Sequence, residues 1–258
     1  MPVAAFQYYF SHLEEEHFRP PILLIHGAGG NHLHWPPDVR RLGGQRIFAP
    51  DLPGHGKSEG VGRQSVGDYA RCTLDLLDAL HLHKAIIIGH SMGAAIALTL
   101  ALEHSRRVLA LGLLGGGARM RVSPDLIENT TSPATLPDAL EALAAMAFSP
   151  KVPPHLKQLA MQRMAATRPT VFHGDFLACN QFDVMDRLTK IRVPTLVMCG
   201  ADDRMTPPRY SEYLASSIKR ARLVLVPDAG HMVMIEKPEA VADELLSFIQ
   251  GIDYQPGE

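Results

Sequence analysis

The chain has 258 residues, of which 46% are hydrophobic and 20% are charged, and its formal net charge is −2. This composition is ordinary for a globular protein, and it supplies enough apolar material for a buried sheet covered on both faces. The nearly balanced charge excludes the strongly basic character that nucleic-acid binding normally requires. We therefore expect no nucleic-acid partner.

The three cysteines, Cys72, Cys179 and Cys199, are odd in number and far apart, which argues against a disulfide framework or a CxxC metal or redox site. Cys199 ends an apolar run and is expected to pack as a small buried hydrophobe. The amino-terminal segment MPVAAFQYYFSHLEEE lacks the basic region and long apolar stretch of a signal peptide. No window holds the roughly 18 uninterrupted apolar residues of a membrane span, so the sequence favours a cytoplasmic protein with no membrane partner.

Short apolar runs alternate along the chain with segments of helical length. Continuous hydrophobicity in short runs is typical of parallel strands that are covered on both faces. The predicted strands are residues 22–26, 46–49, 85–89, 108–114, 195–199 and 223–226. Helices are predicted at 65–80, 92–104 and 238–249, the last with proline in its first turn. This alternation predicts an α/β protein with a doubly wound, mostly parallel sheet flanked by helices.

Residues 118–179 break this alternation, because they contain no strand-like run. Helical stretches at 136–148 and 155–167 are separated by prolines. We interpret this segment as a helical cap over the edge of the sheet, with residues 1–117 and 180–258 forming the core. Its large apolar residues can pack the cap onto the core or line a pocket, and packing is favoured for any single one of Met146, Phe148, Met161, Met164, Phe172 and Phe176.

A G-x-S-x-G sequence, GHSMG, stands between the apolar run 85–89 and the helix predicted from residue 92. In this context the serine sits on a sharp strand-to-helix turn, which lifts its hydroxyl above the sheet. The amino terminus of the following helix favours negative charge as it develops. Ser91 is therefore the candidate nucleophile, and an incidental turn serine is the less favoured interpretation.

A serine hydroxyl needs a base that takes its proton, and the base needs an acid that orients it. In this arrangement the chain order is serine, acid, histidine. Two late strands end in loops with suitable residues: GADDRMTPP follows the strand at 195–199, and PDAGH follows the strand at 223–226. His231 is the candidate base, and the acid is Asp202 or Asp203, because strand carboxyl ends meet at one edge of a parallel sheet.

Five ordered motifs extend over nearly the whole chain: HGAGG from His26, DLPGHGKS from Asp51, GHSMG, GADDRMTPP and AGHMVMIEKP. With them the chain resembles the α/β-hydrolase superfamily, in the group with a short helical cap that includes carboxylesterases, haloperoxidase-like esterases and carbon–carbon bond hydrolases. The resemblance implies that Asp203 is the acid, with Asp202 as its local rival. It also implies that the DLPGHGKS segment, with Asp51 and His55, is a structural turn beside the site.

Stabilising the charge on a reacting carbonyl oxygen requires two backbone N–H donors, which form an oxyanion hole. Met92, the residue after the nucleophile, is one expected donor. By resemblance the other is Ala28, with Gly29 as the alternative. His26 and His90 are expected to be structural, and the GAGG stretch lacks the remaining residues of a phosphate-binding loop.

The resemblance implies a carboxylesterase-like serine hydrolase that uses Ser91, His231 and Asp203, passes through an acyl-enzyme and requires no metal or organic cofactor. The apolar cap favours a small-molecule ester with a small or medium apolar acyl group. One alternative is a carbon–carbon bond hydrolase of ring-cleavage products, for which Arg119, Arg121 and Arg168 are available to hold a dienoate. The other is a ligand receptor of this fold with slow hydrolysis. A monomer and a homodimer are both compatible with the sequence.

Overall fold

The computed structural model describes residues 8–13 and 19–254, so much of the amino-terminal segment judged not to be a signal peptide lies outside the described residues. The described strands form one seven-stranded sheet in the order β1-β3-β2-β4-β5-β6-β7. Every neighbouring pair is parallel except β1 with β3. The strands are β1 (Tyr9–Leu13), β2 (Pro21–Ile25), β3 (Arg46–Pro50), β4 (Ala85–His90), β5 (Val108–Leu114), β6 (Thr195–Gly200) and β7 (Ala221–Val226).

This topology confirms the predicted doubly wound, mostly parallel sheet. The sequence analysis missed β1, and its burial pattern shows the reason: the strand alternates between exposed and half-buried positions at the edge of the sheet. It therefore lacks the continuous apolar run that marks the central strands, whose residues are buried on both faces.

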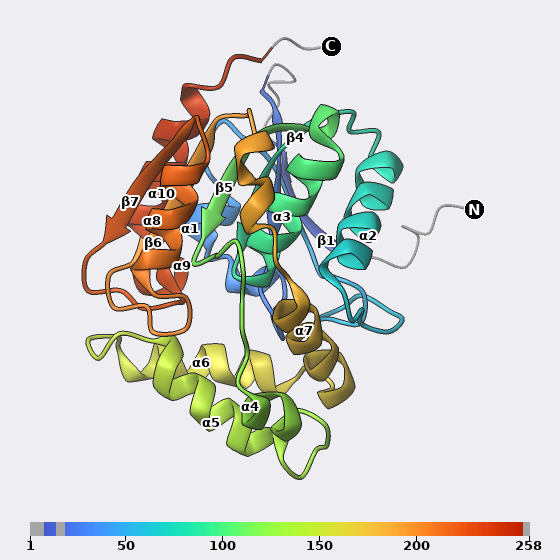
Figure 1. The fold of residues 1–258 in the computed structure, drawn as a ribbon, viewed down its shortest axis with the longest axis vertical. Coiled ribbons are helices and arrows are strands. Elements are labelled where there is room, and N and C mark those ends of the chain that lie inside the picture. Colours follow the sequence, from blue (N-terminus) through green and yellow to red (C-terminus); the bar gives the residue numbers. More distant parts are fainter. Residues whose placement is uncertain (1–7, 14–18, 255–258) are drawn as a thin grey trace.

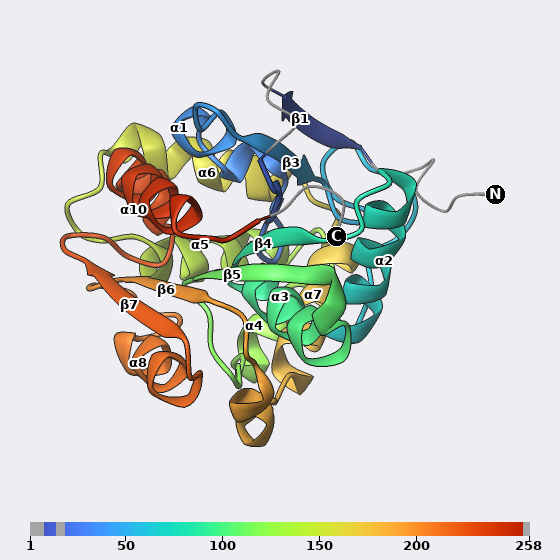
Figure 2. The same cartoon turned by 90° about the horizontal axis from the view of Figure 1, so that it is seen from above.

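Helices cover both faces of the sheet, as Figure 2 shows. On one face lie α1 (Pro37–Arg40) and α10 (Pro238–Gln250), and on the other lie α2 (Val66–Ala79), α3 (Met92–Glu103) and α8 (Pro208–Ser217). The sequence analysis missed α1 and α8, whereas the helices predicted at 65–80, 92–104 and 238–249 are present with ends shifted by one residue. The remaining short helices of the core are η2 (His32–His34), η3 (Ser105–Arg107), η4 (Met185–Lys190) and α9 (Val233–Glu236).

The side chains of the central strands alternate between two apolar cores. In β2, Leu23 and Ile25 pack with α2 and α3, whereas Ile22 and Leu24 pack with α1 and α10. All four are fully buried, and burying an aliphatic side chain of this size contributes about 1.5–3 kcal/mol to stability. Because successive side chains of a strand point to opposite faces of the sheet, neighbouring residues of β2 meet different helices.

Four helices inserted between β5 and β6 form the predicted cap over the carboxyl edge of the sheet (Figure 1). Each carries proline in its first turn, where the missing N–H group has no helical partner to lose. They share an apolar cluster that includes Leu126, Leu143 and Phe172. The division of the chain at residues 118 and 179 stays a prediction. The cap helices are α4 (Pro124–Asn129), α5 (Leu136–Ala147), α6 (Pro154–Ala165) and α7 (Pro169–Gln181).

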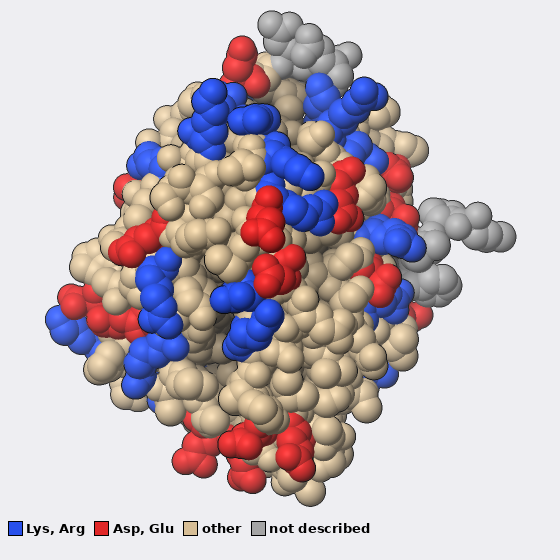
Figure 3. Space-filling view, viewed as in Figure 1, with Lys and Arg blue, Asp and Glu red and all other residues tan. Residues whose placement is uncertain are grey.

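Charged side chains of both signs are scattered over the face seen in Figure 3, and acidic ones gather at its lower end, where α4 and α5 of the cap lie. Within residues 8–13 and 19–254, no helix is both long and apolar enough to cross a membrane.

The junction between β4 and α3 is a sharp turn at Ser91, whose φ is +54° and ψ is −115°. Two glycines make room for it. A Cβ on Gly89 would lie 2.1 Å from the carbonyl oxygen of Gly93, and a Cβ on Gly93 would lie 2.2 Å from the carbonyl oxygen of Ile25. Both contacts are with backbone, which cannot move aside as a flexible side chain can. The helix therefore packs against the sheet only because these positions carry no side chain.

We expect Gly93→Ala to lower the free energy of unfolding by about 3 kcal/mol, because the added methyl overlaps a fixed backbone atom. Alanine normally stabilises a helix relative to glycine, so a lower free energy of unfolding in this variant would point to the steric overlap. Urea denaturation followed by circular dichroism measures it.

Gly67 in α2 is the matched control, since its added Cβ would meet nothing closer than the Ser65 hydroxyl at 4.0 Å. Gly67→Ala should raise the unfolding free energy by about 0.5 kcal/mol. Equal stability changes in the two variants would contradict the packing argument.

Candidate active site

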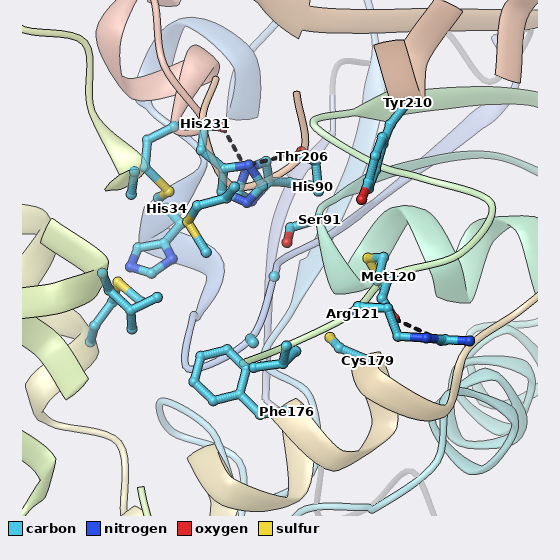
Figure 4. Close-up of a pocket in the computed structure, with 18 residues that line it drawn as sticks. His34, His90, Ser91, Met120, Arg121, Phe176, Cys179, Thr206, Tyr210 and His231 are labelled. Atoms are coloured by element: carbon cyan, nitrogen blue, oxygen red, sulfur yellow. Dashed lines mark hydrogen bonds between the residues drawn. The ribbon is translucent and has the colours of Figure 1, made fainter. Parts of the chain in front are cut away.

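Ser91 occupies the turn that joins β4 to α3, and its side chain faces a pocket beneath the cap (Figure 4). Its backbone N–H donates to the carbonyl of Leu114 at 2.9 Å, while its own carbonyl accepts from Ala94 at 2.9 Å. These bonds fix the turn from both sides. The Ser91 hydroxyl makes no capping bond to the helix.

Asp203 and His231 meet at the carboxyl edge of the sheet, from the loops after β6 and β7. His231 Nδ1 lies 2.9 Å from Asp203 Oδ2, and both side chains are buried. Figure 4 shows the His231 ring beside Ser91, which lines the same pocket. The structure thus brings together the three residues that the sequence analysis singled out for nucleophile, base and acid.

Thr206 also contacts this pair, and the sequence analysis did not identify it. Its hydroxyl lies 2.9 Å from Asp203 Oδ2, 3.1 Å from His231 Nδ1 and 2.8 Å from the carbonyl oxygen of Gly115. The backbone N–H groups of Met205 and Thr206 donate to Asp203 Oδ1 at 2.9 and 2.8 Å. A hydroxyl residue within three positions of the acid in the GADDRMTPP loop is the signal that could have indicated this role.

The surroundings of Asp203 keep it ionised. Burial raises the pKa of the Asp203 carboxyl, but the electrostatic attraction and hydrogen bond of His231 and the donors from Thr206 outweigh burial and hold the pKa below its ordinary value. An ionised carboxylate accepts the hydrogen on Nδ1 of His231, which leaves Nε2 as the nitrogen able to accept a proton.

The rival acid, Asp202, contacts Ser149 and not His231. Its side chain is exposed, and its Oδ2 accepts a hydrogen bond from the Ser149 hydroxyl at 2.8 Å. Of the two neighbouring aspartates, the one that contacts His231 is therefore Asp203.

The loop after β2 places Ala28 on the wall of the pocket. Gly27 and Gly30 close a turn around it, with the Gly30 N–H donating to the Gly27 carbonyl at 3.1 Å. Gly29, the alternative oxyanion donor, has its N–H bonded to Asp175 Oδ2 at 2.8 Å, so this hydrogen is not free for a substrate. Met92, the other expected donor, is buried at the start of α3.

The other histidines of the motifs make structural contacts. His26 accepts a hydrogen bond from the Leu52 N–H at its Nε2 (3.0 Å), and His90 Nε2 lies 2.9 Å from the carbonyl oxygen of His231. Asp51 accepts from the backbone N–H of His32 at 2.7 Å and from that of Lys57 at 2.8 Å. Among the described residues, no three His, Cys, Asp or Glu side chains are grouped so that they could hold a metal ion.

The pocket encloses about 740 Å³ of empty space, part of it open to solvent, and most of its walls are apolar. Of the six cap residues considered from the sequence, Met164 and Phe176 line it, whereas Phe148 and Phe172 are buried in packing. The apolar lining residues are Ala28, Met120, Val122, Leu143, Ala147, Met164, Phe176, Met205 and Met232.

The three arginines considered for a dienoate are not gathered in this pocket. Arg121 lines it, but its guanidinium donates to the carbonyl oxygens of Met120 and Asn180 at 3.1 and 2.9 Å. Arg119 lines a separate hollow, and Arg168 donates to the carbonyl oxygen of Gly60 at the surface. This arrangement gives the carbon–carbon hydrolase alternative little support.

A sequence model of the family described as "alpha/beta hydrolase fold" matches residues 20–238, so the chain belongs to the α/β-hydrolase fold family. It is 30% identical over 251 residues to a pimeloyl-[acyl-carrier protein] methyl ester esterase of Neisseria meningitidis serogroup B, with 89% of this chain and 93% of that protein covered. It is 28% identical over 241 residues to 3-oxoadipate enol-lactonase 1 of Acinetobacter baylyi, with 90% of both chains covered.

Among solved structures, the enol-lactonase from Burkholderia xenovorans LB400 superposes with a TM-score of 0.88 at 25% identity, covering 95% of this chain and 96% of that one. The two curated relatives are thus named as a methyl ester esterase and an enol-lactonase, and the solved structure is named as an enol-lactonase. Together with the family match, they support a hydrolase that cleaves ester bonds.

Buried histidines around the pocket make the fold sensitive to acid. Burial, and secondarily the charge of Arg163, lowers the pKa of His34 to about 4. Between about pH 6.5 and about pH 4, His34 is protonated in the unfolded chain but not in the folded one. The free energy of unfolding therefore falls as the pH drops through this range. His34→Leu should reduce the loss of unfolding free energy between about pH 7 and pH 5.5 by about 1 kcal/mol.

Urea denaturation at the two pH values measures this difference. His155, whose side chain is exposed, is the matched control, since it stays in water in both states. His155→Leu should therefore follow the wild type, and an H34L protein with the wild-type pH dependence would contradict the prediction.

Proposed function

We propose that this protein is a serine hydrolase of carboxylic esters, with Ser91 as nucleophile, His231 as base and Asp203 as the acid that orients it. The observation that carries the proposal is the buried Asp203–His231 contact of 2.9 Å at the pocket that Ser91 faces. The Ser91 hydroxyl adds support, because it makes no capping bond to α3 and its side chain faces the same pocket.

In the proposed reaction, His231 Nε2 takes the proton of Ser91 as the hydroxyl attacks the ester carbonyl. The backbone N–H groups of Ala28 and Met92 hold the oxyanion that forms. His231 then protonates the leaving alcohol, which departs and leaves Ser91 acylated. Water, activated by the same histidine, attacks the acyl-enzyme and releases the carboxylic acid. Asp203 holds the His231 ring through both steps and stabilises its positive charge.

The pocket supports small or medium apolar acyl groups as the substrate class. Its walls carry methionine, leucine and phenylalanine, and Arg121, the arginine that lines it, is engaged with backbone carbonyls. Methionine side chains are flexible and fill irregular space, which suits a series of acyl groups of different shapes. We therefore propose carboxylesterase activity, with the optimal acyl length set by the distance from Ser91 to the cap.

Steady-state hydrolysis of p-nitrophenyl esters of rising acyl length tests the nucleophile. The wild type should turn over repeatedly, and Ser91→Ala should lose about 10⁴-fold or more in kcat, because triad residues act as a unit. Equal activity in the two proteins would refute the role of Ser91. A folded wild type that releases one equivalent and stops would favour the ligand receptor instead.

The acid is tested by a pair of neighbouring isosteric variants. Asp203→Asn should lower kcat by about 10³–10⁴-fold, because the amide no longer holds His231 with its proton on Nδ1. Asp202→Asn should stay within about twofold of the wild type, since Asp202 contacts Ser149 instead. The reverse pattern in kcat would show that Asp202 is the acid.

A further inference from the structure

A buried carboxylate on α7 joins the cap to three separate parts of the core. Asp175 Oδ2 accepts hydrogen bonds from the Gly29 N–H at 2.8 Å and from His55 Nε2 at 2.7 Å, and its Oδ1 accepts from the Tyr69 hydroxyl at 2.5 Å. The side chain is fully buried, and a buried charge is tolerated only where donors of this kind surround it. The bonds that stabilise Asp175 therefore also fix the loop that contains Gly29.

His55 packs against this carboxylate. Its Nδ1 lies 3.1 Å from the carbonyl oxygen of Pro53 and its Nε2 lies 2.7 Å from Asp175 Oδ2, so both ring nitrogens face oxygen atoms that can accept a hydrogen bond. Burial lowers the pKa of His55, but the charge and hydrogen bond of Asp175 outweigh burial and raise it. Asp175 is thus anchored to the turn after β3 by a buried hydrogen bond with His55.

Two further contacts from the same part of the cap reach Gly29. The hydroxyl of Thr167, between α6 and α7, donates to the Gly29 carbonyl oxygen at 3.0 Å. The ring of Phe172 lies so close that a Cβ on Gly29 would be 2.0 Å from it. Gly29 itself has a φ of +63°, which glycine adopts without strain. Both polar groups of Gly29 and one face of its Cα are therefore held by residues 167–175.

We propose that Asp175 and Thr167 are positioning residues that hold the 27–30 loop so that the Ala28 N–H faces the reacting carbonyl oxygen. This inference rests on the proposed function, in which Ala28 is an oxyanion donor. Asp175 fixes the peptide group on the carboxyl side of Ala28, and the Gly30-to-Gly27 bond fixes the peptide group on its amino side. With both fixed, the Ala28 N–H cannot rotate away. The cap thus orients the Ala28 N–H in addition to lining the pocket.

Thr167→Val provides the cleanest test, because it removes one neutral donor and keeps the shape of the side chain. Losing an oxyanion donor outright costs about 10²–10³-fold in kcat, so loosening one should cost about 10-fold, with KM within about twofold. The affinity for an aryl trifluoromethyl ketone, whose adduct places an oxyanion in the same hole, should fall by the same factor. Thr167→Ser keeps the hydroxyl and should restore kcat to within about twofold of the wild type.

Thr130 gives the matched control, since it is also a buried cap threonine whose hydroxyl donates to a carbonyl oxygen, that of Ile127 at 2.7 Å. Thr130→Val should lower the melting temperature about as much as T167V and leave kcat unchanged. A purely structural role for Thr167 predicts the same kcat for both variants, and that result would overturn the proposal.

Asp175→Asn tests the carboxylate itself, and we expect kcat to fall by about 100-fold if the variant folds, because it weakens the bond to Gly29 and leaves His55 unpaired. If D175N does not fold, the T167V comparison decides. Wild-type kcat and ketone affinity in T167V, or in a folded D175N, would overturn the positioning role. An active Ser91→Ala protein would instead refute the proposed function, so the two failures are distinguishable.

Discussion

The site depends on the sharp junction between β4 and α3. At this point the chain passes from strand to helix through the single residue Ser91. It can do so only because Gly89 and Gly93 lack side chains: a Cβ on either would lie about 2 Å from a backbone oxygen. At this junction Ser91 has a positive φ, and its hydroxyl makes no capping bond to α3. Since β4 lies near the centre of the sheet, the loops that follow β2, β6 and β7 can all reach the same space.

Two buried carboxylates hold different parts of the site. Asp203 is satisfied by His231 and by the Thr206 loop, and it faces the base. Asp175 is satisfied by His55, Tyr69 and the Gly29 N–H, and it faces the 27–30 loop. Each cluster saturates its carboxylate with donors, which is the condition for keeping a charge away from water. A saturated buried network is also rigid, and this rigidity is what preorganised donors require.

The cap has two tasks that use different side chains. Apolar residues such as Met164 and Phe176 face the pocket, whereas Phe172 packs inside the cap and against Gly29. Polar residues from the same helices reach into the core. A change in cap sequence that alters the pocket can therefore leave the catalytic loop in place, provided that Thr167 and Asp175 are kept.

The sequence alone determined the fold class, because continuous apolar runs alternating with helical segments leave few arrangements other than a doubly wound sheet. The strand ends also pointed to Ser91, to His231 and to Asp202 or Asp203, and the resemblance to the α/β-hydrolase superfamily selected Asp203 from that pair. Only the tertiary structure revealed the edge strand β1, which has no continuous apolar run, and the role of Asp175, whose bond to Gly29 spans 146 positions. An aspartate in the apolar stretch VFHGDFLAC signals a buried partner, but the identity of that partner depends on how the cap packs on the core.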